Sequence, residues 1–343
     1  MEMRKKEKRA SGTRTAVFFA AVLLLVLVFM AAGLFSGSSG ISPERVLESL
    51  LSPESTGKAA QIILKIRLPR VLMAVLLGGA LAVSGYLLQV FFGTPIAGPF
   101  VLGISSGAKM AVALALIGSL SRAESLSSAG LILVAFCGAF LSTGFILLIS
   151  RRVDHMASLL VAGIMIGYLC SAVTDFLITF ADDADIVNLR GWSMGSFSGI
   201  SMAQVRAALP VVIAAMALAL SLVKPILAVQ QGEAYAESVG VNVRRFRFLL
   251  ILASSLLSAC VTAFAGPVSF VGIAVPFAAR RILRTARPDV LIPACFLLGS
   301  AVTAACDLIA RMAFAPTELY IGTVTSFFGA PVVVFMLAER RRG

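Results

Sequence analysis

Long runs of apolar residues alternate with short polar and basic segments along almost the whole chain. Because roughly 20 apolar residues span a bilayer, this pattern predicts an all-α, polytopic membrane protein with ten transmembrane helices. We expect the spans at about 16–35, 67–92, a stretch following 93–109, 129–150, 157–180, 203–223, 248–265, a stretch within 266–281, 290–312 and 320–338.

Two of these spans are interrupted by glycine and proline. The interruptions are GTPIAGPFVLGISSGAK (93–109) and GPVSFVGIAVPFAARR (266–281). Irregular backbone at membrane depth survives only inside protein or beside a water-filled cavity, so both segments are candidates for a transport pathway. They lie in halves that enter the membrane from opposite sides, which is typical of the inverted repeats of transporters.

The distribution of charge sets the orientation. The chain has 29 Lys and Arg, 17 Asp and Glu and a net charge of +12. Ten spans with both termini inside place roughly 19 basic residues in the cytoplasm and about 9 outside, as the positive-inside rule requires. We therefore expect one transmembrane domain (1–343) with a basic cytoplasmic tail (1–15), an external loop (36–66) and a cytoplasmic loop (224–247).

The external loop contains a helix start, because Ser42, Pro43 and Glu44 are typical of an N-cap, a first position and a first turn. Val46, Leu47, Leu50 and Leu51 would then share one apolar face.

Few residues could carry chemistry. The five cysteines lie in apolar runs without a C-x-x-C pair, and His155 is the only histidine. We therefore expect no metal site, no catalytic site and no cofactor in this chain, which also has no P-loop. The basic clusters have no interleaved aromatic platform for nucleic acid. Asp175 and Lys109 are charges inside spans; an ion-driven secondary transporter using them is the alternative function, and a structural role is the simpler reading.

The cytoplasmic loop 224–247 contains polar, small and basic residues and lies between two apolar runs. Residues 230–238 favour a short helix, Gly240 suits its C′ position, and Asn242 could cap the next helix. Such a surface at the edge of a membrane indicates either a docking site or an ordinary solvated loop.

Three arginines on the external side oppose the charge rule. Arg67 and Arg70 share a helix face at the outer end of one span, and Arg311 ends another, one turn after Asp307. Either they bind an acidic partner, because a guanidinium pairs with carboxylates, or Arg311 forms an internal pair with Asp307.

Several motifs follow one another in the order and spacing of a single family. They are RLPRVLMAVLLGGALAVSGYLLQ (67–89), TPIAGPFVLGISSGA (94–108), GEAYAESVGV (232–241), GPVSFVGIAVPFAAR (266–280), CDLIAR (306–311) and ELYIGTVTSFFGAPVVVFML (318–337). From about residue 60 to 338 the chain resembles the FecCD-type, or BtuC-like, permease subunits of ABC importers for iron–siderophore, haem or vitamin B12.

The resemblance implies a transport subunit of the cell inner membrane, dimeric with a second copy or a paralogue. Its expected partners are a cytoplasmic ATPase dimer, which holds ATP and Mg, and an extracytoplasmic substrate-binding protein. By family position, the residues expected to couple to the ATPase are Gly232, Glu233, Ala236 and Gly240. Those expected to dock the binding protein are Arg67, Arg70 and Arg311, and those expected to gate the pathway are Thr94, Pro95, Ile96, Met156, Ala157 and Ser158.

Two positions depart from the family pattern. The usual Asn-Pro-Leu-Ala is Thr94-Pro95-Ile96-Ala97 here, and the usual Pro-His is Pro276-Phe277. Neither change affects the expected fold, but both weaken any assignment of the chelate from these positions.

Overall fold

The structure is a computed structural model that describes residues 2–37, 41–51, 57–118, 127–150 and 156–340. Within these ranges the chain is helical and contains no strand. The helices are α1 (Glu2–Phe35), α2 (Pro43–Leu51), α3 (Lys58–Ile62), η1 (Ile63–Arg67), α4 (Leu68–Phe92), η2 (Pro99–Leu102), α5 (Ile104–Gly118), α6 (Ser128–Ser150), α7 (Met156–Ile178), α8 (Asp183–Ser193), α9 (Met202–Ser221), α10 (Val223–Val229), α11 (Glu233–Ser238), α12 (Val243–Ala265), α13 (Val271–Leu283), α14 (Pro288–Met312) and α15 (Ile321–Arg340).

Every predicted span contains a helix. Among the described residues, α1, the stretch Lys58–Phe92, α6, α7, α9, α12 and α14 are long and apolar enough to cross a membrane. The shorter apolar helices α5 and α15 and the 13-residue α13 occupy the remaining predicted spans. The all-helical membrane fold is therefore confirmed.

One boundary was predicted wrongly. The second span was expected to begin near Arg67, with Pro69 in its first turn, but the helix already begins at Lys58. The π-helical turn η1 precedes Pro69 and keeps the stretch continuous. A π turn shifts the hydrogen-bond register, so the missing N–H of proline does not break the helix.

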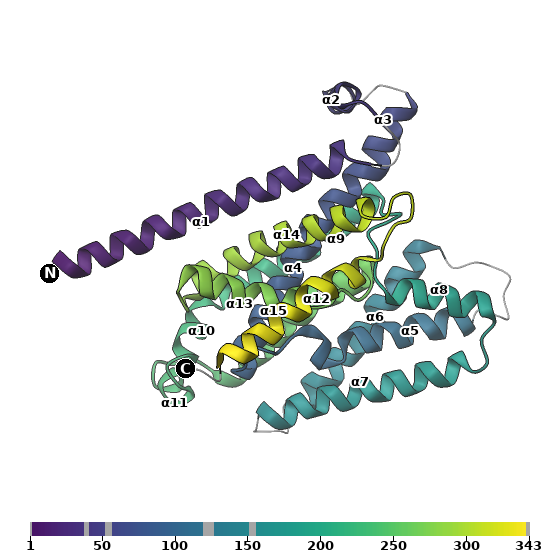
Figure 1. Ribbon diagram of the computed structural model, residues 1–343. Coiled ribbons are helices and arrows are strands. Elements are labelled where there is room, and N and C mark those ends of the chain that lie inside the picture. The colour runs from purple at the N-terminus through teal and green to yellow at the C-terminus, as the bar shows by residue number, and fades with distance from the viewer. Residues whose placement is uncertain (1, 38–40, 52–56, 119–126, 151–155, 341–343) are drawn as a thin grey trace.

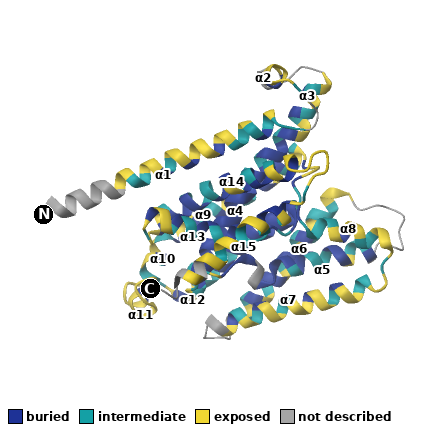
Figure 2. Cartoon of the chain, in the orientation of Figure 1, coloured by how far each residue is buried: buried dark blue, intermediate teal, exposed yellow. Residues whose placement is uncertain are grey.

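α4 is the central element, and its contacts are made by small residues. It packs against α14, α12 and α13, and Figure 2 shows its dark, buried core position. A Cβ on Gly85 would overlap the carbonyl oxygen of Gly272 in α13, and a Cβ on Gly299 would lie 2.5 Å from the Gly78 oxygen. Small residues at such crossings let backbones approach closely inside a membrane.

The two interrupted segments meet inside the bundle. One follows α4 after Gly93 and leads through η2 to α5, and the other leads from α12 through Gly266 to α13. A Cβ on Gly272 would lie 3.1 Å from Pro99 Cδ, and one on Gly98 would lie 2.8 Å from Ile273 Cγ1. Gln89 of α4 donates to the Ile273 carbonyl at 3.1 Å. Where the two segments cross, the irregular backbone is thus covered by protein.

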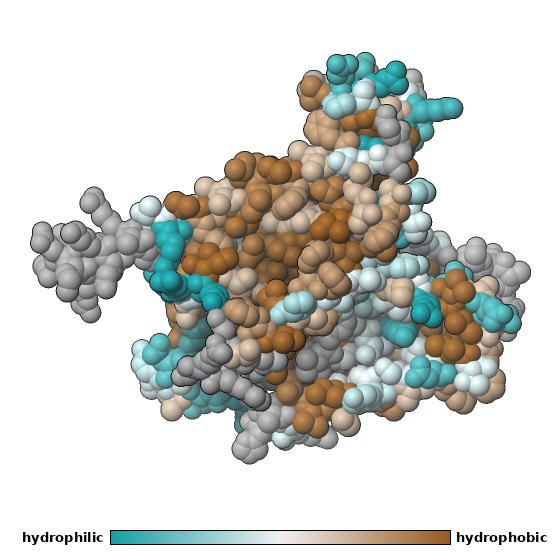
Figure 3. Space-filling model, in the orientation of Figure 1, coloured by the Kyte–Doolittle hydropathy of each residue, from teal (hydrophilic) through white to brown (hydrophobic). Residues whose placement is uncertain are grey.

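The bundle has two polar ends. We call the end with α8 and the α14–α15 loop the outer end, and the end with α10 and α11 the inner end, as the charge pattern predicts (Figure 1). In Figure 3 hydrophobic residues cover the middle of the face in view, and hydrophilic residues gather at α2 and α3 and at the lower left. This banding fits a protein that lies across a bilayer.

The short helix of the external loop is confirmed as α2, which begins at Pro43 with Glu44 in its first turn. Of its predicted apolar face, Val46 is buried and Leu47 is exposed. The side chains of Leu50 and Leu51 lie outside the described part of the chain.

Candidate functional site

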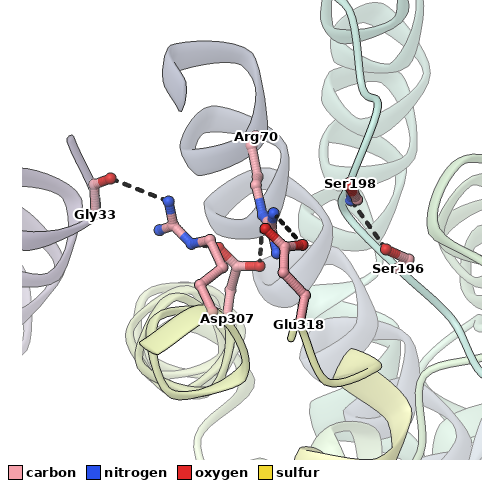
Figure 4. A network of polar contacts seen from close by, with 7 residues as sticks. Gly33, Arg70, Ser196, Ser198, Asp307 and Glu318 are labelled. Atoms are coloured by element: carbon pink, nitrogen blue, oxygen red, sulfur yellow. Dashed lines mark hydrogen bonds and ion pairs between the residues drawn. The ribbon is translucent and has the colours of Figure 1, made fainter. Parts of the chain in front are cut away.

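The three outer arginines lie together and are buried. Arg67 ends η1, Arg70 lies in the first turn of α4, and Arg311 lies in the last turn of α14. Their exposed fractions are 5%, 6% and 9%. We call these three residues, with Asp307 and Glu318, the outer arginine cluster; Figure 4 shows how Arg70, Asp307 and Glu318 of this cluster lie.

Asp307 bridges two of the arginines. Arg70 Nε donates to Asp307 Oδ1 at 3.0 Å, and Arg311 Nε lies 3.2 Å from Asp307 Oδ2. The carboxylate is buried, so its attraction to both guanidinium groups is little screened by solvent. The internal Asp307–Arg311 pair that the sequence left open is therefore confirmed.

The end of α1 completes the cluster through its backbone. Arg311 Nη1 donates to the Gly33 carbonyl at 3.1 Å, and Arg67 Nη1 donates to the Leu34 carbonyl at 2.7 Å. These carbonyls belong to the last turn of α1, where no intrahelical donor is available. A Cβ on Gly33 would lie 2.9 Å from Arg311 Nη2, so glycine makes room for the guanidinium.

Glu318 also belongs to the cluster, and the sequence reasoning missed it. Arg70 Nη1 donates to Glu318 Oε2 at 2.8 Å, and the glutamate side chain is 45% exposed. A signal was present, because arginines placed against the charge rule need counter-charges, and Glu318 is the first acid after Arg311.

The inner loop has the backbone that the sequence predicted. Gly240 has φ 85°, Gly240 N donates to the Glu237 carbonyl at 3.0 Å, and Val241 N donates to the Ala236 carbonyl at 2.9 Å. This pattern is a Schellman motif. The Asn242 side chain then caps α12 by accepting from Arg245 N at 2.9 Å. Both local predictions are confirmed.

α11 presents an exposed surface at the inner end. Ala236 is buried, whereas Tyr235 and Val239, one turn apart, are 52% and 53% exposed. Glu233 is paired with Arg247 at 2.5 Å, which ties the start of α11 to α12. Gly232 precedes α11 with φ 121°, a backbone region open to glycine. The loop therefore holds a preformed, partly apolar helix away from the bundle.

The predicted gate residues lie at the inner end but are only partly described. Thr94 and Pro95 are half-buried and Ile96 is exposed, in a turn that follows Gly93, whose φ is 61°. Met156 begins α7, and the side chains of Met156 and Ala157 lie outside the described residues. Ser158 is exposed. Their gating role stays a prediction.

Asp175 and Lys109 are not joined. Asp175 is exposed on α7, Lys109 is half-buried on α5, and no ion pair links them among the described residues. Within the same residues, no group of three or more His, Cys, Asp or Glu side chains could hold a metal ion.

Comparison with known proteins agrees with this geometry. The model of the FecCD transport family matches residues 23–339. The vitamin B12 import system permease protein BtuC of Klebsiella pneumoniae subsp. pneumoniae is 34% identical over 322 residues, 93% of this chain and 92% of the relative. The Escherichia coli O9:H4 protein of the same name is 32% identical over 322 residues, 93% of this chain and 94% of the relative.

Two solved structures are also similar. One is described as an inward-facing conformation of a metal-chelate type ABC transporter; it has a TM-score of 0.83 and 25% identity, and the match covers 94% of this chain and 99% of that one. The other is PsaBC from Streptococcus pneumoniae in complex with Fab, with a TM-score of 0.54 and 14% identity over 84% of this chain and 94% of that one. The second shares the fold alone.

Proposed function

The chain belongs to the FecCD transport family, and from this premise we propose that it is the membrane-spanning subunit of an importer driven by a separate ATPase. As an ABC-importer permease of the FecCD/BtuC type, it is a multi-pass membrane protein whose relatives are transport subunits. It moves a substrate and leaves ATP hydrolysis, with its Mg, to the partner.

We assign ten membrane crossings, with both termini in the cytoplasm, to α1, α4, α5, α6, α7, α9, α12, α13, α14 and α15. A second permease subunit, identical or paralogous, packs against apolar surface that this chain leaves open. The support is the exposure of large residues at two helices: Tyr168 and Phe176 on α7 with Phe180 in the turn after it, and Phe327 and Phe335 on α15. Large apolar side chains exposed together on one chain indicate a protein or lipid interface.

The substrate is a bulky metal chelate, and cobalamin is the first one to test. The support comes from the names of the relatives, which are vitamin B12 permeases, and from the metal-chelate type of the similar structure. Uptake of radiolabelled cyanocobalamin into proteoliposomes containing the assembled transporter, compared with a ferric siderophore and with haem, separates the three substrates.

The two ends of the bundle carry the partners. The ATPase receives α11 and its flanking turns at the inner end, and the substrate-binding protein docks over the outer arginine cluster. Closure of the ATPase on ATP moves the inner loop, and this biases the pathway between outward- and inward-facing states. Met156 to Ser158 and Thr94 to Ile96 close the inner side.

A single observation carries this proposal: α11 stands out from the bundle with Tyr235 and Val239 exposed on a preformed turn. Exposed aromatic residues on a rigid surface are typical anchors of an interface. We expect Tyr235→Arg to weaken the affinity for the ATPase by at least about 30-fold, which corresponds to a hot-spot loss near 2 kcal/mol. The ATPase should then be lost from the co-purified complex.

The control is Tyr320→Arg, the same substitution on an exposed tyrosine of the outer end. It should leave the ATPase complex unchanged, because it lies across the membrane from α11. If both variants keep the complex, or if no ATPase co-purifies with the unaltered chain, the importer assignment fails and the ion-driven alternative becomes the better one.

A further inference from the structure

The two carboxylates of the outer arginine cluster are held very differently. Asp307 is a side chain of α14 that is 1% exposed and lies against both Arg70 and Arg311. Glu318 comes from the exposed loop between α14 and α15, forms an ion pair with Arg70, and is 45% exposed on its side chain. Asp307 therefore belongs to the interior, whereas Glu318 closes the cluster from the solvent side (Figure 4).

The loop that carries Glu318 is fixed by its backbone close to the cluster. Leu319 N donates to the Ala310 carbonyl of α14 at 2.9 Å, and Ile321 N donates to the Gly195 carbonyl at 3.2 Å. The glutamate can therefore leave Arg70 by rotating its side chain while the loop stays in place. Two exposed aromatic residues, Phe314 and Tyr320, lie in the same loop.

The cluster contains three guanidinium groups and two carboxylates, so it keeps a net positive charge even with Glu318 in place. Glu318 is half-exposed, so solvent screens its contact with buried Arg70 more than it screens the Arg70–Asp307 contact. A carboxylate delivered by a docked protein would meet Arg70 with water excluded, which strengthens the same interaction. Exchange of one carboxylate for another is thus favourable only when a partner covers the loop.

From this geometry we propose that Glu318 is an internal stand-in for an acidic side chain of the substrate-binding protein. It neutralises Arg70 while the outer end is free, and the incoming carboxylate displaces it when the binding protein docks. This inference rests on the proposed function, because it needs a binding protein at the outer end. The docking surface would then comprise Arg70 and the exposed Phe314 and Tyr320 of the loop that carries Glu318.

The two possible roles of Glu318 predict opposite effects of its removal on the affinity for the binding protein. A competitor that is removed should improve docking, whereas a residue that orients Arg70 for the partner should weaken docking when it is lost. Glu318→Gln keeps the size of the side chain and removes its charge. Since solvent screens the half-exposed carboxylate, its removal should have a modest effect, and we expect the Kd for the binding protein to fall by about two- to fivefold.

The experiment uses the full chain in nanodiscs, with the substrate-binding protein encoded beside it as the probe, and records binding by surface plasmon resonance. Glu44→Gln is the matched control, because Glu44 is an exposed glutamate of α2 at the same outer end. The gain of Glu318→Gln should shrink at 1 M salt, where the Debye length is about 3 Å.

The outcomes separate the inference from the function beneath it. Tighter binding by Glu318→Gln, with Glu44→Gln unchanged, supports the stand-in role. Unchanged or weaker binding overturns it while leaving docking intact, as does a loss of thermal stability equal to that of an Asp307 variant. No binding by the unaltered chain counts against the proposed function itself.

Discussion

The outer arginine cluster and the inner loop around α11 were both expected to contact partners, yet they are built in opposite ways. At the outer end the charged groups are buried, and they are satisfied by Asp307 and by carbonyls of α1. At the inner end Tyr235 and Val239 are exposed, and only Ala236 is buried below them. One surface is held by side-chain charges, and the other is shaped by backbone turns.

The difference teaches which residues serve the fold and which remain for partners. Guanidinium groups removed from water need internal partners, so most of the outer cluster must act first in holding α1, α4 and α14 together. The turns at Gly232 and Gly240 order the inner loop without using the outward side chains of α11. Substitutions should therefore damage folding at one end and assembly at the other.

The largest expected effect comes from Asp307→Ala. It leaves Arg70 and Arg311 buried without their shared carboxylate, and breaking a buried pair in this way costs about 3–5 kcal/mol. We expect a clear fall in the apparent Tm of the purified chain in detergent. The measurement is size-exclusion chromatography of the heated chain.

The control lies on the same helix. Asp289 pairs with Arg287 at 2.6 Å at the other end of α14, but this pair is exposed. Asp289→Ala should therefore change stability by less than about 1 kcal/mol. Equal losses from the two variants would contradict the view that burial makes the outer cluster essential for the fold.

A smaller effect is expected from Gly240→Ala at the inner end. With φ at 85°, a Cβ at this position costs about 1–2 kcal/mol of backbone strain. The strain loosens the turn after α11, so amides at 236–241 should exchange faster with deuterium while the Tm of the bundle stays constant.

The matched glycine is Gly57, which has φ −67° and open space around its Cα. Gly57→Ala should leave exchange at 236–241 and the Tm unchanged. If Gly240→Ala instead lowers the Tm as Asp307→Ala does, the inner loop is part of the cooperative fold and the contrast between the two ends disappears.

The sequence predicted what depends on local patterns and missed what depends on contacts between distant helices. Apolar runs located the helices of the predicted spans, and the Gly240 and Asn242 turn was predictable because its hydrogen bonds join near neighbours. Glu318 was missed because its partner Arg70 lies in another helix. The extension of α4 back to Lys58 was hidden by Pro69, whose effect depends on the π turn before it.

The resemblance to a family supplied what neither pattern nor packing could, namely the coupling, docking and gating roles. The contacts of these residues then distinguish the three docking arginines. Arg67 and Arg311 are held by carbonyls of α1 and by Asp307, whereas Arg70 also meets the half-exposed Glu318. Of the three docking candidates, Arg70 is therefore the one that we propose a partner reaches, by displacing the Glu318 side chain.

The smallest expected effect is that of Asp175→Asn. This substitution tests whether a charge within a predicted membrane span drives transport. Asp175 is exposed on α7 and has no ion pair within the described residues, so the substitution removes no internal contact of its side chain. A surface change of this kind alters free energies by less than about 0.5 kcal/mol, so ATP-driven uptake should stay within about twofold. The measurement is chelate uptake by proteoliposomes between pH 5.5 and 8, with and without ATP, beside Lys109→Gln. Loss of uptake, or uptake that follows a proton gradient without ATP, would move the energy source from the inner loop to α7 and refute the division of roles between the two ends.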